Sequence, residues 1–134
     1  MWWTTLAGKL EQASALDPAV QAASGAVTAV LPQGPLKDVL HGRWLGHAVH
    51  PLLVTVPIGM WTGAILLDLT GEEWARRAAR RLVGAGLLAV APTAATGLAD
   101  WSELGDFHRP KRVGLVHAGA NTATALLYAA SFFF

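Results

Sequence analysis

The chain has 134 residues, which is long enough for one domain. Hydrophobic residues make up 53% of it and charged residues 14%, against roughly 25% charged residues in ordinary soluble domains, so the composition indicates a membrane protein. A net charge of +1 excludes the strongly basic surface of a nucleic-acid-binding protein. The sequence has no cysteine, which excludes disulfides, thiolate metal sites and cysteine-held iron–sulphur clusters within it.

Residues 1–43 are expected to form an N-terminal amphipathic, interfacial head that does not span the membrane. They show no basic segment followed by an apolar core, so a cleaved signal peptide is not expected. Asp17 and Pro18 predict a helix start, with Asp17 as the N-cap and Pro18 in the first helical position. Apolar residues then recur at helical spacing as far as Val30. This helix is expected to lie on the membrane surface or to pack against the bundle.

Residues 44–134 are expected to form a transmembrane helical domain. Three stretches lack every Lys, Arg, Asp and Glu: residues 44–67, 82–99 and 113–134. An α-helix rises 1.5 Å per residue, so about 20 residues cross the hydrocarbon core of a bilayer. The fold class is therefore predicted to be all-α integral membrane, with spans at about 51–69, 82–99 and 113–134.

Prolines and glycines inside the spans predict their local geometry. Pro57 and Pro92 are expected to kink the first two spans, and Pro57 should free a backbone carbonyl one turn earlier. Gly59 and Gly63 form a Gly-x-x-x-Gly pair, which predicts close contact with another helix, either within the chain or in a homo-oligomer.

The charged residues gather in two predicted loops, residues 70–81 and 100–112. The head and the second loop share one side of the membrane, because two crossings separate them. Near the spans that side has five Lys and Arg residues and the opposite side has four. The positive-inside rule then favours a multi-pass protein of the plasma membrane with a cytoplasmic head.

Alternating spans bring a small set of polar residues to one membrane face. His50 lies at the start of the first span, Asp100 at the end of the second and His117 one turn inside the third. His47 belongs to the same face, and Asn121 follows His117 by one helical turn. Polar side chains within spans normally face the bundle interior, so these residues are expected to face one another.

Four interpretations of this cluster remain open. In the first, the polar groups simply bond one another and hold the helices together. His50 and His117 could instead ligate a haem iron from facing helices. With Asp100 they would supply two nitrogens and one carboxylate to a non-haem metal. A proton or ion path through Asp68, Asp100 and the histidines is the fourth. His41 and His108 are expected to be solvated loop residues.

Three blocks of sequence carry a family resemblance: HGRWLGHAVHPLLVTVPIGMWTGAILLDL, GLADW and RVGLVHAGANTATALLYAAS. Their order and spacing resemble an uncharacterised family of bacterial membrane proteins, a domain of unknown function, over residues 36–133. Signature positions of that family fall on His47, His50, Pro51, Pro57, Asp68, Gly97, Asp100, Trp101, His117 and Asn121. Some members are fused to a Rieske iron–sulphur domain, which by analogy implies a Rieske-type or quinone-linked redox partner and favours haem.

Similar proteins usually continue into a fourth span, whereas this sequence stops at Phe134. The resemblance therefore implies a four-helix bundle lacking its last helix, and we expect either a truncated gene product or a protein that takes the missing helix from a partner.

The function favoured by the sequence is a redox-associated membrane module that binds haem b or a single metal ion between the first and third spans. His50 and His117 would be the ligands, Asp100 would orient an imidazole, and Asn121 would bond His117 or a ligand. One alternative is a structural anchor or assembly partner without a cofactor. Another is a small transporter or proton relay using Thr93, Thr124, Tyr128 and Asp68. No catalytic constellation is visible, so an enzyme acting alone is not expected.

Overall fold

The computed structural model describes residues 2–105 and 108–134, and these residues form helices and turns without a β-strand. In chain order the helices are α1 Trp2–Gln12, the 3-10 turn η1 Ser14–Leu16, α2 Asp17–Val30, α3 Pro35–His41, the 3-10 turn η2 Arg43–Leu45, α4 His50–Leu53, α5 Thr55–Asp68, α6 Glu73–Ser102 and α7 His108–Phe133. The predicted all-helical character is confirmed.

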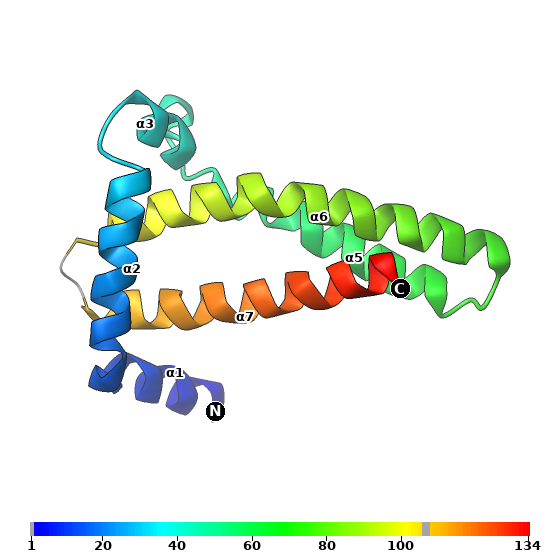
Figure 1. The fold of residues 1–134 in the computed structure, drawn as a ribbon, viewed down its shortest axis with the longest axis horizontal. Helices are drawn as coiled ribbons and strands as arrows, with labels where there is room; N and C mark the ends of the chain where they lie inside the picture. Colours follow the sequence, from blue (N-terminus) through cyan, green and yellow to red (C-terminus); the bar gives the residue numbers. More distant parts are fainter. Residues whose placement is uncertain (1, 106–107) are drawn as a thin grey trace.

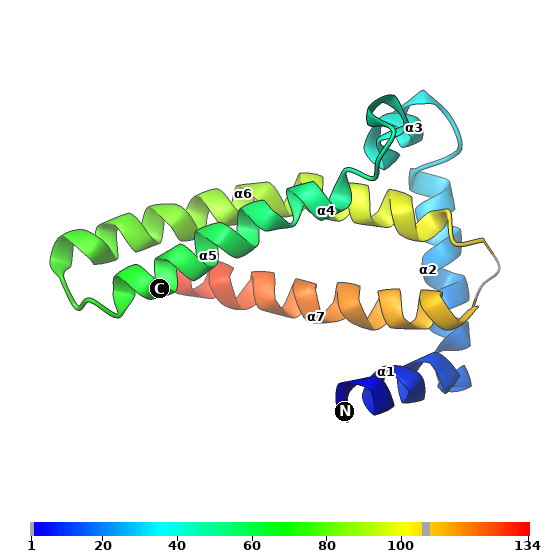
Figure 2. The same ribbon diagram turned by 180° about the vertical axis from the view of Figure 1, so that it is seen from behind.

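Helices α5, α6 and α7 run beside one another, and the N-terminal helices gather at one end (Figure 1). Helix α2 crosses the ends of α6 and α7, while α1 turns back to pack on α7. Seen from behind, α4 and α5 follow α6 along most of its length (Figure 2). The long helices are therefore tied together at the end that carries the head.

Among the described residues, two helical segments are long and apolar enough to cross a membrane: His50–Asp68 and Glu73–Ser102. They contain the first and second predicted spans. Helix α7, which contains the predicted third span, is not among them. Its polar side chains and its basic first turns lower its hydropathy, so a third crossing remains a proposal.

The predicted loop at residues 70–81 is wrong for most of its length. Helix α6 begins at Glu73, so the turn is short and the arginines lie on the helix. Glu73 complements the positive N-terminal end of the helix dipole and pairs with Arg77 at 3.2 Å, one turn later. Ala75 and Ala79 are buried on the opposite side. The charged residues of this segment led to the prediction of a loop. In an amphipathic helix, the charged residues lie on one face and the buried alanines on the other.

The second predicted loop, residues 100–112, is also shorter than expected. Helix α6 continues to Ser102 and α7 begins at His108, so most of its charged residues lie on helix ends. The α2 start is correct within a residue, but Asp17 is the first helical residue and makes no capping bond. Its carboxylate binds Arg112 of α7 instead. Helix α1 was not predicted.

The break between α4 and α5 falls at Val54, three residues before Pro57. Proline has no N–H for the carbonyl four residues earlier, which is that of Leu53. The Thr93 hydroxyl of α6 lies 3.4 Å from this Leu53 oxygen. The kink predicted from Pro57 is thus present, and a neighbouring helix approaches the freed carbonyl.

Several aromatic and imidazole side chains pack directly against glycines of a neighbouring helix. The four ring–glycine contacts are His50 on Gly97, Trp61 on Gly86, Trp101 on Gly114 and Phe132 on Gly84. A Cβ at Gly97 would come 2.8 Å from His50 Cε1, which is closer than real contacts allow. Of the predicted Gly59 and Gly63 pair, Gly63 does approach α6, because its Cβ would lie 3.3 Å from Leu82 Cδ1, whereas no described atom lies within 4 Å of where the Gly59 Cβ would be. Contact of Gly59 with a second copy stays a prediction.

Candidate functional site

His50, the first residue of α4, is half-buried against α6. Its Nδ1 lies 2.9 Å from the carbonyl oxygen of Thr93 and 3.4 Å from Thr96 Oγ1. A carbonyl oxygen only accepts, so Nδ1 carries the hydrogen and Nε2 of the neutral ring holds a lone pair. Gly97 leaves room for the ring beside the helix backbone. The site therefore fixes both the tautomer and the orientation of His50.

The threonines around His50 are satisfied by their own helix. Thr93 Oγ1 donates to the carbonyl of Ala89 at 2.7 Å, and Thr96 Oγ1 lies 2.9 Å from that of Thr93. Both threonines are buried. In the part of the chain that the structure describes, every buried side-chain nitrogen or oxygen has a hydrogen-bond partner. The polar atoms around His50 thus hold α4 and α6 together.

Asp100 binds His41, and the expectation that His41 is a solvated loop residue is wrong. The Asp100 Oδ1 to His41 Nδ1 distance is 2.6 Å, and both side chains are partly buried. His41 ends α3, which packs on the last turns of α6. Asp100 therefore does orient an imidazole, but the imidazole is that of His41, not of the two histidines expected to be ligands.

A second pair lies beside the first. Lys37 Nζ binds Glu103 at 2.6 Å although the lysine is only 4% exposed, and Gln33 donates to the same carboxylate at 3.3 Å. The hydrogen bond from Lys37, followed by that from Gln33, lowers the pKa of Glu103 from its ordinary value. Lys37 and His41 are four residues apart, and Asp100 and Glu103 are three apart. This helical spacing places each set on one face of its helix, but it does not by itself predict which residues pair.

A third ion pair joins the head to α7. The Arg112 guanidinium places Nε 2.7 Å and Nη2 2.8 Å from the two carboxylate oxygens of Asp17. Arg112 Nη1 also donates to the carbonyl of Glu11. Such a two-pronged geometry is the strong form of a carboxylate–arginine contact. The hydrogen bond from Arg112 lowers the pKa of Asp17 below its usual range.

His117 and Asn121 lie together on an exposed face of α7. Asn121 Nδ2 is 2.9 Å from His117 Nε2 and 2.9 Å from the carbonyl of His117. In residues 2–105 and 108–134, neither side chain hydrogen-bonds to α4, α5 or α6. The predicted stripe divides further along, because Thr124 is exposed while Tyr128 stacks on Trp61 with ring centroids 4.1 Å apart.

The remaining predicted residues lie apart from this pair. His47 is exposed and its Nδ1 contacts the carbonyl of Ala48 at 2.9 Å. Asp68, at the far end of α5, is exposed, and so is His108 at the start of α7. Among the described residues, no three His, Asp or Glu side chains converge as a metal site would require. The structure brings together His41 with Asp100 and His117 with Asn121.

The comparison with known families assigns the chain to a class of membrane protein. Residues 46–134, about two thirds of the sequence, match the family described as predicted membrane protein (DUF2231). The protein therefore belongs to this family, as the three sequence blocks indicated. No curated protein and no solved structure matches the chain.

Proposed function

We propose that the protein is a membrane assembly module that pairs with a second copy of itself through the middle of α7. In this proposal residues 1–43 form the head, residues 44–134 form the transmembrane domain, and α7 is a third span of a plasma-membrane protein with a cytoplasmic head.

The observation that supports this proposal most strongly is that the middle of α7 is exposed. Residues 116–124 are exposed all around the helix, whereas both ends of α7 are held, by Trp101 near the start and by Trp61 near the end. This segment presents the polar stripe of His117, Asn121 and Thr124. Polar groups that face hydrocarbon are costly, so a span of this kind gains from a partner helix.

A second copy of the chain would offer the hydrogen-bond partners that the donor and acceptor of this polar stripe require. Asn121 Nδ2 donates to His117 Nε2, so the neutral His117 ring carries its hydrogen on Nδ1. The stripe thus offers a donor, His117 Nδ1–H, and an acceptor, Asn121 Oδ1, and each copy supplies what the other can use. A twofold dimer requires a self-complementary surface of this kind. Ala120, which lies beside this stripe on the helix, would permit close approach of the two helices.

Cysteine cross-linking tests the pairing, because the natural sequence has no cysteine. Thr124→Cys lies on the stripe, and Leu126→Cys, two positions further round α7, is the matched exposed control. Oxidation of the full chain in lipid vesicles should give a disulfide dimer through Cys at position 124 and not at 126. Equal cross-linking at both positions, or none at 124, contradicts the proposal.

A second variant measures the contribution of the polar contacts. Asn121→Leu in the Thr124→Cys background should weaken association about 3- to 20-fold for each hydrogen bond lost between spans. Dilution of the protein in lipid gives the association constant. Unchanged association would assign the dimer to apolar packing instead.

The second candidate is the redox-associated module with haem or a metal between the first and third spans. The observation that favours it is the Nδ1–H bond of His50 to the Thr93 carbonyl, because metal-binding histidines commonly donate their other ring N–H in this way. His117 would be the second ligand. Asp100 is engaged with His41, so the version that uses its carboxylate as a metal ligand has less support.

Absorption spectra of the detergent-purified protein, oxidised and reduced, with metal analysis on the same sample, test this candidate. A Soret band that shifts on reduction and is lost in His50→Ala and His117→Ala would support haem. Stoichiometric metal without a Soret band would support the metal version. A folded, colourless and metal-free sample would count against both and leave the assembly role.

A further inference from the structure

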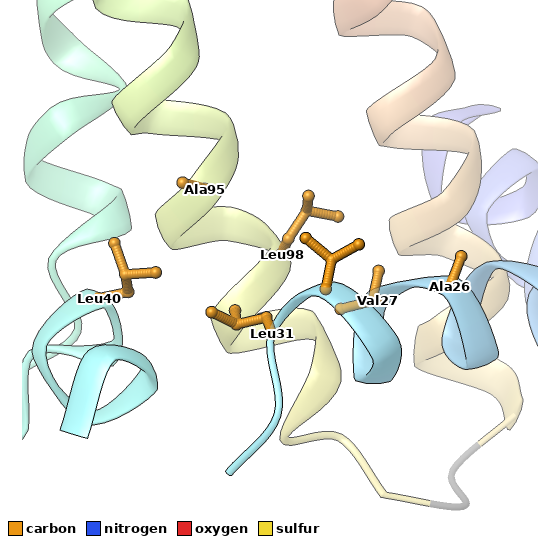
Figure 3. Close-up of a pocket in the computed structure, with 7 residues that line it drawn as sticks. Ala26, Val27, Leu31, Leu40, Ala95 and Leu98 are labelled. Carbon is orange, nitrogen blue, oxygen red and sulfur yellow. The ribbon is translucent and has the colours of Figure 1, made fainter. Parts of the chain in front are cut away.

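An apolar groove lies where α2 crosses the end of α6 (Figure 3). It has a volume of about 270 Å³ and is lined by Ala26, Val27, Val30, Leu31, Leu40, Ala95 and Leu98. Val30 is 83% exposed and Leu98 is 42% exposed, so the groove is open to the surroundings of the protein. Three elements, α2, α3 and α6, build its walls.

The walls of this groove are entirely apolar. Every lining side chain is Ala, Val or Leu, and no polar atom contributes to the surface. A water molecule needs two to four polar partners, and these walls offer none. An extended peptide segment would bring backbone N–H and C=O groups that these walls could not satisfy. The groove therefore suits a hydrocarbon chain better than water or an extended polypeptide.

The position of the groove on α6 places it where the acyl chains of lipids are available. Ala95 and Leu98 belong to α6, one of the two helices that can cross a membrane. Polar pairs begin directly beyond them, first Asp100 with His41 and then Glu103 with Lys37. The groove thus occupies the last apolar turns of the helix, at the level where lipid chains approach their headgroups.

We propose that the groove holds one acyl chain of a membrane lipid beneath α2. Two nearby cations are already paired, Lys37 with Glu103 and Arg43 with Asp38, and the lining of the groove itself contains no cation. The site therefore recognises the hydrocarbon chain and has no preference for an anionic headgroup. The lipid fills the space between the head and α6 and so stabilises their contact.

The test uses the full chain reconstituted in phosphatidylcholine vesicles that contain a phospholipid with a photoreactive diazirine in its acyl chain. Labelled peptides are located by mass spectrometry. Val27, Leu31 and Leu98 should be labelled more heavily than Ile58 and Leu66 of α5, which are exposed and do not line this groove. Equal labelling of groove and control residues overturns the proposal.

Filling the groove provides the second measurement. Ala95→Phe should abolish the excess labelling of Val27 and Leu31 and leave that of Ile58 and Leu66 unchanged. Ala94→Phe, on an exposed position of the same helix, is the matched control and should change neither. Since the Ile58 and Leu66 labelling reports an intact helix pair, a misfolded variant is recognised by its change there.

Two further experiments could also overturn the acyl-chain site. In the first, phosphatidylglycerol replaces phosphatidylcholine, and the labelling of the groove should not change. A strong preference for the anionic lipid would overturn recognition of the acyl chain. Protein-to-protein cross-links from a photoreactive residue at Val30 would show a second copy in the groove. These results do not depend on the α7 dimer, because the groove lies on α2 and α6.

Discussion

His50 and Gly97 illustrate at the scale of single residues how the long helices approach each other. The imidazole donates to the Thr93 carbonyl and lies flush against α6 where Gly97 has no side chain. The sequence singles out both His50 and Gly97 through the family resemblance, but it does not show that they touch. Because the two residues are in contact, a side chain at position 97 would displace the His50 ring.

Gly97→Ala should destabilise the protein, because its Cβ would lie 2.8 Å from His50 Cε1 and the ring would have to move. The expected loss is about 1–3 kcal/mol, as for other overpacked sites. Gly59→Ala is the control, since no described atom lies near its Cβ, and it should be neutral or slightly stabilising within a helix. Reversible unfolding in mixed micelles measures both. Equal effects of the two substitutions would contradict the contact.

At the scale of elements, α7 is fixed at its two ends. Near its start Trp101 Nε1 donates to the Lys111 carbonyl at 3.1 Å and the ring lies on Gly114. Near its end Tyr128 stacks on Trp61, whose ring lies on Gly86. The exposed segment between these two clamps is the surface assigned above to the partner helix.

Tyr128→Ala should release the C-terminal end of α7. The stacked pair contributes about 0.5–1.5 kcal/mol beyond the area that it buries, so the unfolding free energy should fall by more than that amount. Leu127→Ala, at a neighbouring exposed position, should change it by less than about 0.5 kcal/mol. Hydrogen exchange should accelerate at residues 125–133 in Tyr128→Ala alone. Uniform acceleration along α7 would instead indicate that the helix has no separate clamp at this end.

At the scale of the whole molecule, ion pairs hold the head on the long helices. Asp17 with Arg112 joins α2 to α7, and Lys37 with Glu103 joins α3 to the end of α6. Both carboxyl groups have pKa values lowered by these hydrogen bonds. A lowered pKa in the folded state means that the contribution to stability is present above the ordinary pKa, near 4, and is lost as the pH falls through the lower folded value.

The head should therefore loosen on acidification from neutral pH to below about pH 4. Asp17→Asn should lower stability at neutral pH and reduce the loss on acidification, because this carboxyl no longer titrates. The remaining acid dependence should then come mainly from Glu103. Asp38→Asn, which alters an exposed pair with Arg43, is the control and should have a smaller effect. Thermal unfolding across this pH range measures the change, and an identical acid profile in Asp17→Asn would refute the role of the pair.

Hydropathy and charge in the sequence were sufficient for the helical membrane class and the approximate positions of α5 and α6, because these properties depend on local composition. The family was indicated by the resemblance of the three sequence blocks. Local pattern also located the start of α2 and the kink before Pro57. It misplaced the helix ends at residues 73 and 108, because charged residues are compatible with either a loop or the exposed face of a helix.

Only the tertiary structure decided which polar residues meet. Asp100, His47, His50 and His117 were expected to face one another, whereas Asp100 binds His41, His50 bonds to the α6 backbone, and His117 faces outward with Asn121. Spacing along a helix establishes which residues share a face, but the direction of that face depends on how the helix is rotated and tilted against its neighbours. Here the rings seated on glycines and the ion pairs of the head set that rotation, and both are contacts between residues far apart in the sequence.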